Sequence, residues 1–395
     1  MRIAADKNIP EIESACEGLG EIRLFDSRDQ KRLHDLLQTA DVLLCRSTIA
    51  VNAALLEGTP VRFVTTATSG TDHFDTNWLD AQGITYASAA GSNARSVAEW
   101  WAASMLELHA RGRVRLEGAT VGIVGVGHVG TQVADVAHAL GMHCRFNDPP
   151  RAARGEQPVA WSPDGFVSME EILSCDIVTL HVPLTREGKY PTAGFFGERQ
   201  FGCMRPGALF VNAARGGVMD APVVLAWSAA GNPLVLDVFP GEPHIDPALV
   251  RTADIATPHI AGHAWDGKLL GTEMVARALR EWFSGTSSQK LDTAGLEGTK
   301  TQRLKIFEKA DLSADLPSDV YGEVLERVRS VYDVRVDDAA LRRAVEMEPE
   351  AAAAEFARLR AEYPLRREFA ASELEVSGLS GASIHMLTAL GFRRG

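Results

Sequence analysis

Three absences narrow the possibilities before any motif is considered. The 395-residue chain has only five cysteines and no C-x-x-C pair, so neither a disulfide framework nor a zinc site is expected. It has no excess of positive charge: a formal net charge of −12 disfavours a nucleic-acid partner. The segment 1–7 is charged where a signal peptide would be apolar, and the Gly-rich stretch 120–134 is too short to span a membrane. We therefore expect a cytoplasmic protein that binds neither metal nor membrane.

Short apolar runs alternate with helical patterns along the first ninety residues. Buried strands are predicted at 22–25, 41–45, 61–65 and 84–87, with helices such as 29–38 and 52–57 between them. After a long helix expected at 94–110, a second and more regular series begins. Its strands are predicted at 120–124, 144–147, 177–181, 208–212, 234–238 and 255–257. The pattern indicates an α/β fold with two doubly wound, Rossmann-like parallel sheets.

The composition changes toward the C-terminus. Residues 286–303 are rich in Ser, Thr, Gly and Lys without periodicity, which is typical of a linker. Four valines between 320 and 331 then recur at helical spacing, and an Ala-rich run at 351–361 stops before Pro364. A small α-rich module is therefore predicted after the linker.

The strongest local motif is G-x-G-x-x-G, formed by Gly125, Gly127 and Gly130. It follows the apolar strand 120–124 and opens a helix with an apolar face. In such a motif the first glycine makes a tight turn, the second lets the backbone approach a pyrophosphate, and the third lets the helix pack on the strand. The helix N-terminus adds free N–H groups for the phosphates. The motif predicts a bound dinucleotide.

An acidic residue after the next predicted strand bears on whether the dinucleotide is NAD or NADP. Asp148 follows the next predicted strand, where its carboxylate can accept hydrogen bonds from a ribose 2′-hydroxyl and would repel a 2′-phosphate. This favours NAD over NADP. Arg151 and Arg154 lie close by in the sequence and keep NADP open.

Three polar segments follow later strands, at the end of the sheet where α/β proteins bind ligands. Histidine as a residue type titrates near neutrality, which suits His259 to an acid/base role; Glu242 can fix its tautomer, and Arg215 can clamp a carboxylate. Singly, each has an ordinary structural explanation: a surface charge, a turn residue, a hydrogen-bonded core histidine. Their ordered occurrence after a nucleotide motif favours hydride transfer from a 2-hydroxy acid.

The segments GVGHVG, NAARGGVMD, DVFPGEP and TPHIAGH together resemble the D-isomer-specific 2-hydroxyacid dehydrogenase family. The resemblance covers residues 1–285 and implies an NAD-dependent oxidoreductase. It implies a substrate-binding domain over 1–93 that is completed by 259–285, and an NAD-binding domain over 94–258. It also implies further cofactor contacts at His128, Val129, Val182, Ala214, Asp237 and Gly262.

Another set of segments resembles one branch of this family more closely. These segments are 6–10, 46–48, 66–73, 147–151 and 332–335. The branch oxidises 4-phospho-D-erythronate in pyridoxal 5′-phosphate synthesis, as a homodimer with a C-terminal dimerisation domain, which would be residues 304–395 here. The resemblance implies substrate contacts at Ser47 and Thr68. Arg46 is a nearby cation for the phosphate.

This chain departs from the branch at two positions. His263 stands where a tyrosine is usual, and Val182 stands where a threonine is common. An imidazole at position 263 keeps a polar contact for the substrate, and the valine removes one hydroxyl near the cofactor. Both changes bear on affinity rather than on the chemistry.

Two other functions stay open at this point. Another hydroxy acid, such as phosphoglycerate or hydroxypyruvate, would use the same catalytic residues, although the C-terminal module speaks against it. A non-catalytic regulator that senses NAD would keep the nucleotide motif. The presence of Arg215, Glu242 and His259 together favours catalysis.

Overall fold

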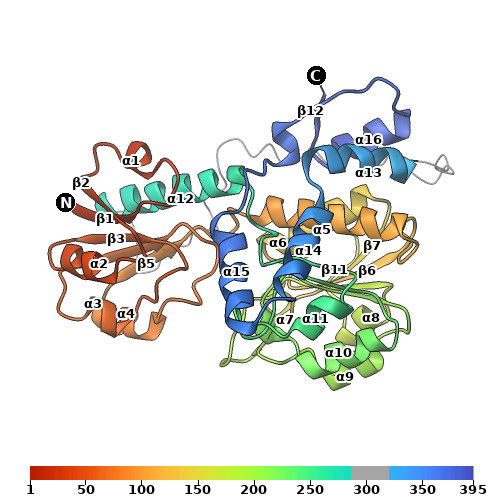
Figure 1. Cartoon of the computed structure of the whole chain (residues 1–395), viewed down its shortest axis with the longest axis horizontal. Helices are drawn as coiled ribbons and strands as arrows, with labels where there is room; N and C mark the ends of the chain where they lie inside the picture. The colour runs from red at the N-terminus through yellow and green to blue at the C-terminus, as the bar shows by residue number, and fades with distance from the viewer. Residues whose placement is uncertain (286–319, 395) are drawn as a thin grey trace. The chain divides into compact units, whose positions relative to one another are not determined.

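The computed structural model describes residues 1–285 and 320–394, and the chain divides into two compact units (Figure 1). One unit holds residues 1–93 and the helical segment that begins at Trp265. The other holds residues 94–264 together with the described C-terminal residues. The expected linker at 286–303 lies outside the described residues. The predicted domain boundaries and their roles stay predictions.

The first unit is built on a five-stranded parallel sheet. In sheet order its strands are β2 (Glu21–Phe25), β1 (Arg2–Asp6), β3 (Val42–Cys45), β4 (Phe63–Thr66) and β5 (Thr85–Ser88). Its helices are α1 (Ile12–Ala15), α2 (Gln30–Leu37), α3 (Ala53–Leu56), α4 (Thr76–Gln82) and α12 (Trp265–Phe283). Side chains cap three of them: Asp29 begins α2, Asn52 begins α3 and Asp75 begins α4.

Strand β1 was not among the predicted strands. Charged residues stand at both of its ends, Arg2 and Asp6, and only three apolar residues lie between them. Those three are at most 2% exposed, because β1 pairs with β2 on one side and β3 on the other. Its central place in the sheet therefore comes from pairing rather than from a long apolar run.

The second unit is built on a six-stranded parallel sheet. In sheet order its strands are β11 (Ile255–Ala256), β10 (Leu234–Leu236), β9 (Leu209–Asn212), β8 (Ile177–Leu180), β6 (Thr120–Val124) and β7 (His143–Asn147). Its helices are α5 (Ala94–Ala110), α6 (His128–Ala139), α7 (Pro149–Ala153), α8 (Met169–Leu173), α9 (Glu198–Cys203), α10 (Ala221–Ala229), α11 (Pro247–Thr252) and the 3₁₀ turn η1 (Gly216–Val218). The inner strands are buried along their length, as parallel strands covered on both faces are. The predicted fold class is confirmed.

The C-terminal residues are α-rich, as expected. They form α13 (Val320–Val331), α14 (Val334–Ala344), α15 (Pro349–Ala361), the 3₁₀ turn η3 (Phe369–Ala371), α16 (Gly381–Ala389) and a small parallel pair, β12 (Glu373–Leu374) with β13 (Arg393–Arg394). Helix α14 covers the edge of the large sheet. The Asp338 carboxylate accepts a hydrogen bond of 2.8 Å from the backbone N–H of Ala256 in β11, and Arg342 donates to the carbonyls of Val250 and Ala253. An edge strand that would otherwise stay open is thereby closed.

The five cysteines are all free thiols. Burial raises the pKa of Cys16 and Cys175 to about 11 and that of Cys144 to about 12. Because the thiolate is the reactive form, these three side chains behave as small apolar residues of the core. In the described parts of the chain, no helix is long and apolar enough to cross a lipid bilayer.

Candidate active site

The polar segments singled out in the sequence follow strands of the six-stranded sheet. They come after β6, β7, β8, β9, β10 and β11, and contribute Gly125, Asp148, Val182, Arg215, Glu242 and His259 in that order. All six strands run parallel. These residues therefore share one edge of the sheet, where its carboxyl ends meet.

His259 and Glu242 form a hydrogen-bonded pair at this edge. His259 Nδ1 lies 2.7 Å from Glu242 Oε2, and Glu242 Oε1 accepts a hydrogen bond of 2.8 Å from the backbone N–H of Phe239. Burial favours the neutral carboxyl, but the bond to His259 and the Phe239 N–H outweigh it and hold the pKa of Glu242 below its ordinary value. Glu242 is thus an anion near neutral pH. With Nδ1 engaged, Nε2 of His259 is the nitrogen left to exchange a proton with a ligand.

The backbone around His259 is held in an unusual conformation. His259 has φ 56°, in the left-handed region that non-glycine residues rarely adopt. The buried Asp237 carboxylate accepts hydrogen bonds from the backbone N–H groups of Ile260 (2.8 Å) and Ala261 (3.0 Å) and from the Thr257 hydroxyl (2.6 Å). Burial raises the pKa of Asp237 to about 6, against these hydrogen bonds and the nearby His259. Asp237, expected as a cofactor contact, fixes the loop that presents the imidazole.

Arg215 lies on the neighbouring loop. A Cβ on Gly216 would lie 2.0 Å from the carbonyl carbon of Phe239, so the loop that carries Arg215 packs directly on the loop that carries Glu242. Asn212 fixes this turn, because its side-chain amide donates to the Arg215 carbonyl and its oxygen accepts from the N–H of Ala214. Arg215, Glu242 and His259 are therefore on three adjacent loops of one unit.

Two residues of the C-terminal segment also reach these loops, and no sequence motif marked them. Arg360 of α15 places Nη1 4.0 Å from Glu242 Oε2. The ring of Tyr363 meets the ring of His263 edge to face, with 5.6 Å between centroids. Gly262 lies beside His263 on the same loop, which begins at the end of β11. The C-terminal helices are thus part of the surroundings of the catalytic pair.

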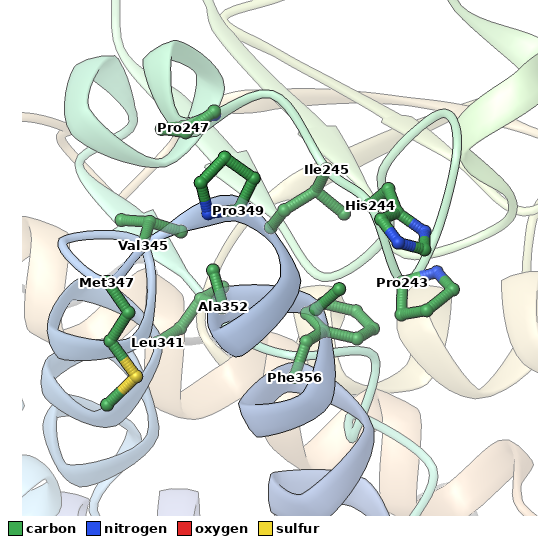
Figure 2. Close-up of a pocket in the computed structure, with 11 residues that line it drawn as sticks. Pro243, His244, Ile245, Pro247, Leu341, Val345, Met347, Pro349, Ala352 and Phe356 are labelled. Carbon is green, nitrogen blue, oxygen red and sulfur yellow. The ribbon is translucent and has the colours of Figure 1, made fainter.

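An apolar cavity of about 160 Å³ lies between the loop that follows Glu242 and helices α14 and α15 (Figure 2). Pro243 and Ile245 line one side, and Leu341, Met347 and Phe356 line the other. His244 is the one residue with a polar side chain among those that line it. The cavity is a packing gap between the C-terminal helices and the loop, and neither His259 nor Glu242 is among its lining residues.

The glycine motif has the geometry of a phosphate cradle. Gly125 has φ 85°, and a Cβ there would lie 2.7 Å from the carbonyl oxygen of His181 and 2.9 Å from Val182 Cγ1. A Cβ on Gly130 would lie 2.0 Å from the Gly125 oxygen, whereas the space beside Gly127 is open. Within residues 1–285 and 320–394, no side chain caps the first turn of α6, which begins with His128 and Val129. Its N–H groups are therefore left for an anion, and the residues fit a dinucleotide pyrophosphate.

Asp148 has a structural bond on each oxygen. One oxygen accepts from the Val126 N–H (2.9 Å) and the other from the Arg151 N–H (3.1 Å), and both retain lone pairs for a ribose hydroxyl. Glu156 pairs with the guanidinium groups of both Arg151 and Arg154. The two cations that could have bound the 2′-phosphate of NADP are thus paired with a carboxylate, which favours NAD as the cofactor.

The predicted substrate contacts Arg46, Ser47 and Thr68 lie in the first unit, apart from the residues described so far. Arg46 and Ser47 follow β3, and Arg46 Nε is 3.0 Å from the carboxylate of Asp6 at the end of β1. Thr68 follows β4, and its hydroxyl is 2.7 Å from that of Thr66. The three residues share the carboxyl edge of the five-stranded sheet, since β1, β3 and β4 are neighbours in it.

Comparison with known proteins agrees with this geometry. Residues 87–261 match the family described as D-isomer specific 2-hydroxyacid dehydrogenase, NAD binding domain, and residues 304–391 match a domain of unknown function, DUF3410. The erythronate-4-phosphate dehydrogenase of Marinobacter nauticus is 40% identical over 100% of this chain and 99% of its own length. The erythronate-4-phosphate dehydrogenase of Salinibacter ruber is 41% identical over 93% of this chain and 92% of its own length.

Solved structures show the same fold at lower identity. The NAD-bound 3-phosphoglycerate dehydrogenase of Entamoeba histolytica matches with a TM-score of 0.60 at 21% identity, over 73% of this chain and 96% of its own. The NAD-dependent formate dehydrogenase of Staphylococcus aureus, in complex with NAD, matches with a TM-score of 0.59 at 23% identity, over 73% of this chain and 97% of its own. These structures match nearly whole, although about a quarter of this chain is left over.

Proposed function

The chain belongs to the erythronate-4-phosphate dehydrogenase family, and from that premise we propose that it oxidises 4-phospho-D-erythronate to 3-hydroxy-2-oxo-4-phosphobutanoate. It is an NAD-dependent dehydrogenase with an NAD-binding domain. The observation that carries the proposal for this chain is the 2.7 Å pair between His259 and Glu242, on loops next to the one that bears Arg215.

The three side chains divide the work of the oxidation. His259 Nε2 accepts the proton of the C2 hydroxyl while the C2 hydride leaves, and the Glu242 carboxylate stabilises the imidazolium that forms. Arg215 holds the substrate carboxylate with its guanidinium fork. The Gly125–Gly130 cradle would hold NAD, which would supply the hydride acceptor. The products are a 2-keto acid, NADH and one proton.

The remaining assignments are also proposals. Arg46, Ser47 and Thr68 contact the phosphorylated substrate, and His263, which stands where a tyrosine is usual, keeps a polar contact for the substrate. The C-terminal domain forms a homodimer, as the sequence resemblance implies. Five free thiols support a reducing compartment, the cytoplasm, where the reaction would serve pyridoxal 5′-phosphate synthesis.

The direct test is NADH formation from 4-phospho-D-erythronate and NAD, with a carbonyl trap because the oxidation is uphill. We expect NADH with this substrate and far less with 3-phospho-D-glycerate. Faster turnover of 3-phospho-D-glycerate would reassign the substrate. Tight NAD binding without turnover of any hydroxy acid would favour the regulator instead.

Replacing Glu242 by Gln tests the pair itself. The amide keeps the size of the side chain but cannot stabilise an imidazolium, so we expect kcat to fall by about 10²- to 10⁴-fold. The acidic limb of the pH–rate profile should move to lower pH, because protonation of the imidazole loses its carboxylate partner. Glu350→Gln is the matched control, since Glu350 pairs with the exposed His244 at 3.4 Å and should leave rate and profile unchanged. An unchanged profile in Glu242→Gln would contradict the assignment.

Gly130→Val tests the cradle. A Cβ at this position would lie 2.0 Å from the Gly125 backbone oxygen, so the loop must shift away from the pyrophosphate site. We expect NAD affinity, measured by calorimetric titration, to fall about 100-fold, which corresponds to losing one or two hydrogen bonds to a charged group. Gly202→Ala in α9 is the control, because nothing lies within 4 Å of its Cβ position. Wild-type NAD affinity in Gly130→Val would exclude the cradle as the cofactor site.

A further inference from the structure

We propose that Lys268 and Arg46 together bind the phosphate group of the substrate, at the carboxyl edge of the five-stranded sheet. Lys268 lies in the first turn of α12, and no motif in the sequence marks it. The inference rests on the proposed function for the identity of the substrate. It adds a second cation to a site for which the sequence suggested only Arg46.

The position of Lys268 follows from how α12 packs on the strand ends. A Cβ on Gly271 would lie 2.9 Å from the carbonyl oxygen of Ala67, the residue directly after β4. The hydroxyl of Thr272 donates a hydrogen bond of 2.8 Å to the carbonyl of Pro10, in the loop after β1. Lys268 precedes these two residues by three and four positions, so it lies on the same helix face, one turn nearer the N-terminus. Lys268 therefore lies on the face of α12 that packs against the strand-end loops, and not on the opposite face of the helix.

The two cations lie at the ends of neighbouring strands, because Ala67, on which α12 packs, donates its backbone N–H at 2.9 Å to the carbonyl of Cys45, the residue before Arg46. Asp6 is 1% exposed, and its carboxylate pairs with Arg46 and accepts hydrogen bonds from Asn8. The ammonium of Lys268 has no hydrogen-bond or ion-pair partner among the residues that the structure describes. Burial and the charge of Arg46 lower the pKa of Lys268 below that of an exposed lysine. A half-buried ammonium beside another cation is unfavourable, and an anion bound between the two removes that cost.

The charge and donors at this edge suit a phosphate. Lys268 and Arg46 supply two positive charges, of which Asp6 offsets one, and a phosphate monoester brings nearly two negative charges at neutral pH. Ser47 follows Arg46, and Thr68 follows β4 at the same edge, so hydroxyl donors stand beside the cations. The substrate carboxylate is assigned to Arg215, which leaves the phosphate as the anion for this site.

The test compares a phosphorylated with an unphosphorylated substrate. We expect Lys268→Gln to raise KM for 4-phospho-D-erythronate about 10- to 100-fold, the effect of one charged hydrogen bond, with kcat changed less than about threefold. For D-erythronate, kcat/KM should stay at the wild-type value. Lys268→Arg keeps the charge and should recover most of the affinity, and Lys31→Gln removes an exposed lysine from α2 of the same unit as the control. An unchanged KM for the phosphorylated substrate, or equal losses on both substrates, would overturn the inference.

A binding measurement separates this inference from the proposed function. Inorganic phosphate is titrated into the full-length wild type, Lys268→Gln and Lys31→Gln, each first shown to melt at the wild-type temperature. Weaker phosphate binding in Lys268→Gln alone supports the site, even if 4-phospho-D-erythronate proves not to be the substrate. Equal phosphate binding by all three proteins overturns the site, even if the wild type oxidises that substrate.

Discussion

A His259→Asn enzyme should turn over about 10²- to 10⁴-fold more slowly than the wild type while it binds NAD with unchanged affinity. His259 has φ 56°, and asparagine is the replacement of choice because it tolerates this left-handed backbone conformation. The loop bonds from Asp237 to Ile260 and Ala261 use backbone N–H groups and stay in place. The loss therefore reports the missing imidazole rather than a displaced loop.

Two measurements check this result, namely NADH formation in a single turnover and a calorimetric NAD titration. His244→Asn is the matched control, because His244 also pairs with a glutamate, but its side chain is exposed and its partner is Glu350 rather than Glu242. We expect the control to keep the wild-type rate. A His259→Asn enzyme that kept more than about a tenth of wild-type kcat would show that the C2 hydroxyl loses its proton to another group.

The sheet and its loops could be predicted because their signals are local. Strand β6, the glycine turn and the first residues of α6 follow one another directly, and Gly125 and Gly130 each have a steric reason in the structure. The loops of Arg215, Glu242 and His259 each follow a short apolar strand, and parallel strands bring such loops to one edge. The 2.7 Å bond between residues 242 and 259 thus follows from β10 and β11 being neighbours.

What the sequence did not reveal depends on contacts between distant segments. Lys268 and Arg360 are ordinary cations on helices. The packing of α12 against Ala67 brings Lys268 to the strand ends of its sheet, and the packing of α15 places Arg360 4.0 Å from Glu242. Asp148 was expected as a free ribose ligand, but it also ties Val126 to α7. The periodicity of the sequence does not predict such contacts, because each of them joins residues that are far apart in the sequence.

The same limit applies to the way the C-terminal segment is anchored to the catalytic loop. Arg366 is 5% exposed and donates hydrogen bonds to the carbonyls of Ala261 (3.1 Å) and Ser96 (2.6 Å), with its guanidinium 3.8 Å from the ring centroid of Tyr332. Close by, the Glu99 carboxylate accepts from the Phe369 N–H at 3.0 Å. One buried cation thus joins α5, the loop after His259 and the segment between α15 and η3.

We expect Arg366→Met to lower the free energy of unfolding by about 3–5 kcal/mol, because it leaves two carbonyls without their donor and removes one of the two cations near the buried Glu99 carboxylate, of which Arg95 is the other. Since Ala261 lies two residues after His259, kcat should fall as well. Urea unfolding and steady-state kinetics measure the two effects. Arg358→Met is the control, because its guanidinium is exposed and pairs only with Glu355 and Glu362 among the residues described. Equal unfolding midpoints for the wild type and Arg366→Met would mean that this anchor contributes nothing.

The loss of folding stability caused by Arg366→Met should depend on pH, and the direction of this dependence follows from Glu99. Burial raises the pKa of Glu99 to about 7, against the opposing charges of Arg95 and Arg366. An acid whose pKa is higher in the folded state binds its proton there first, so its ionisation lowers stability as the pH rises from about 4.5 to about 7. Without Arg366 the carboxylate is less well compensated, and the pKa of Glu99 should rise further. The destabilisation by Arg366→Met should therefore be larger at pH 8 than at pH 6, and an equal destabilisation at both pH values would show that the charge of Arg366 does not act on Glu99.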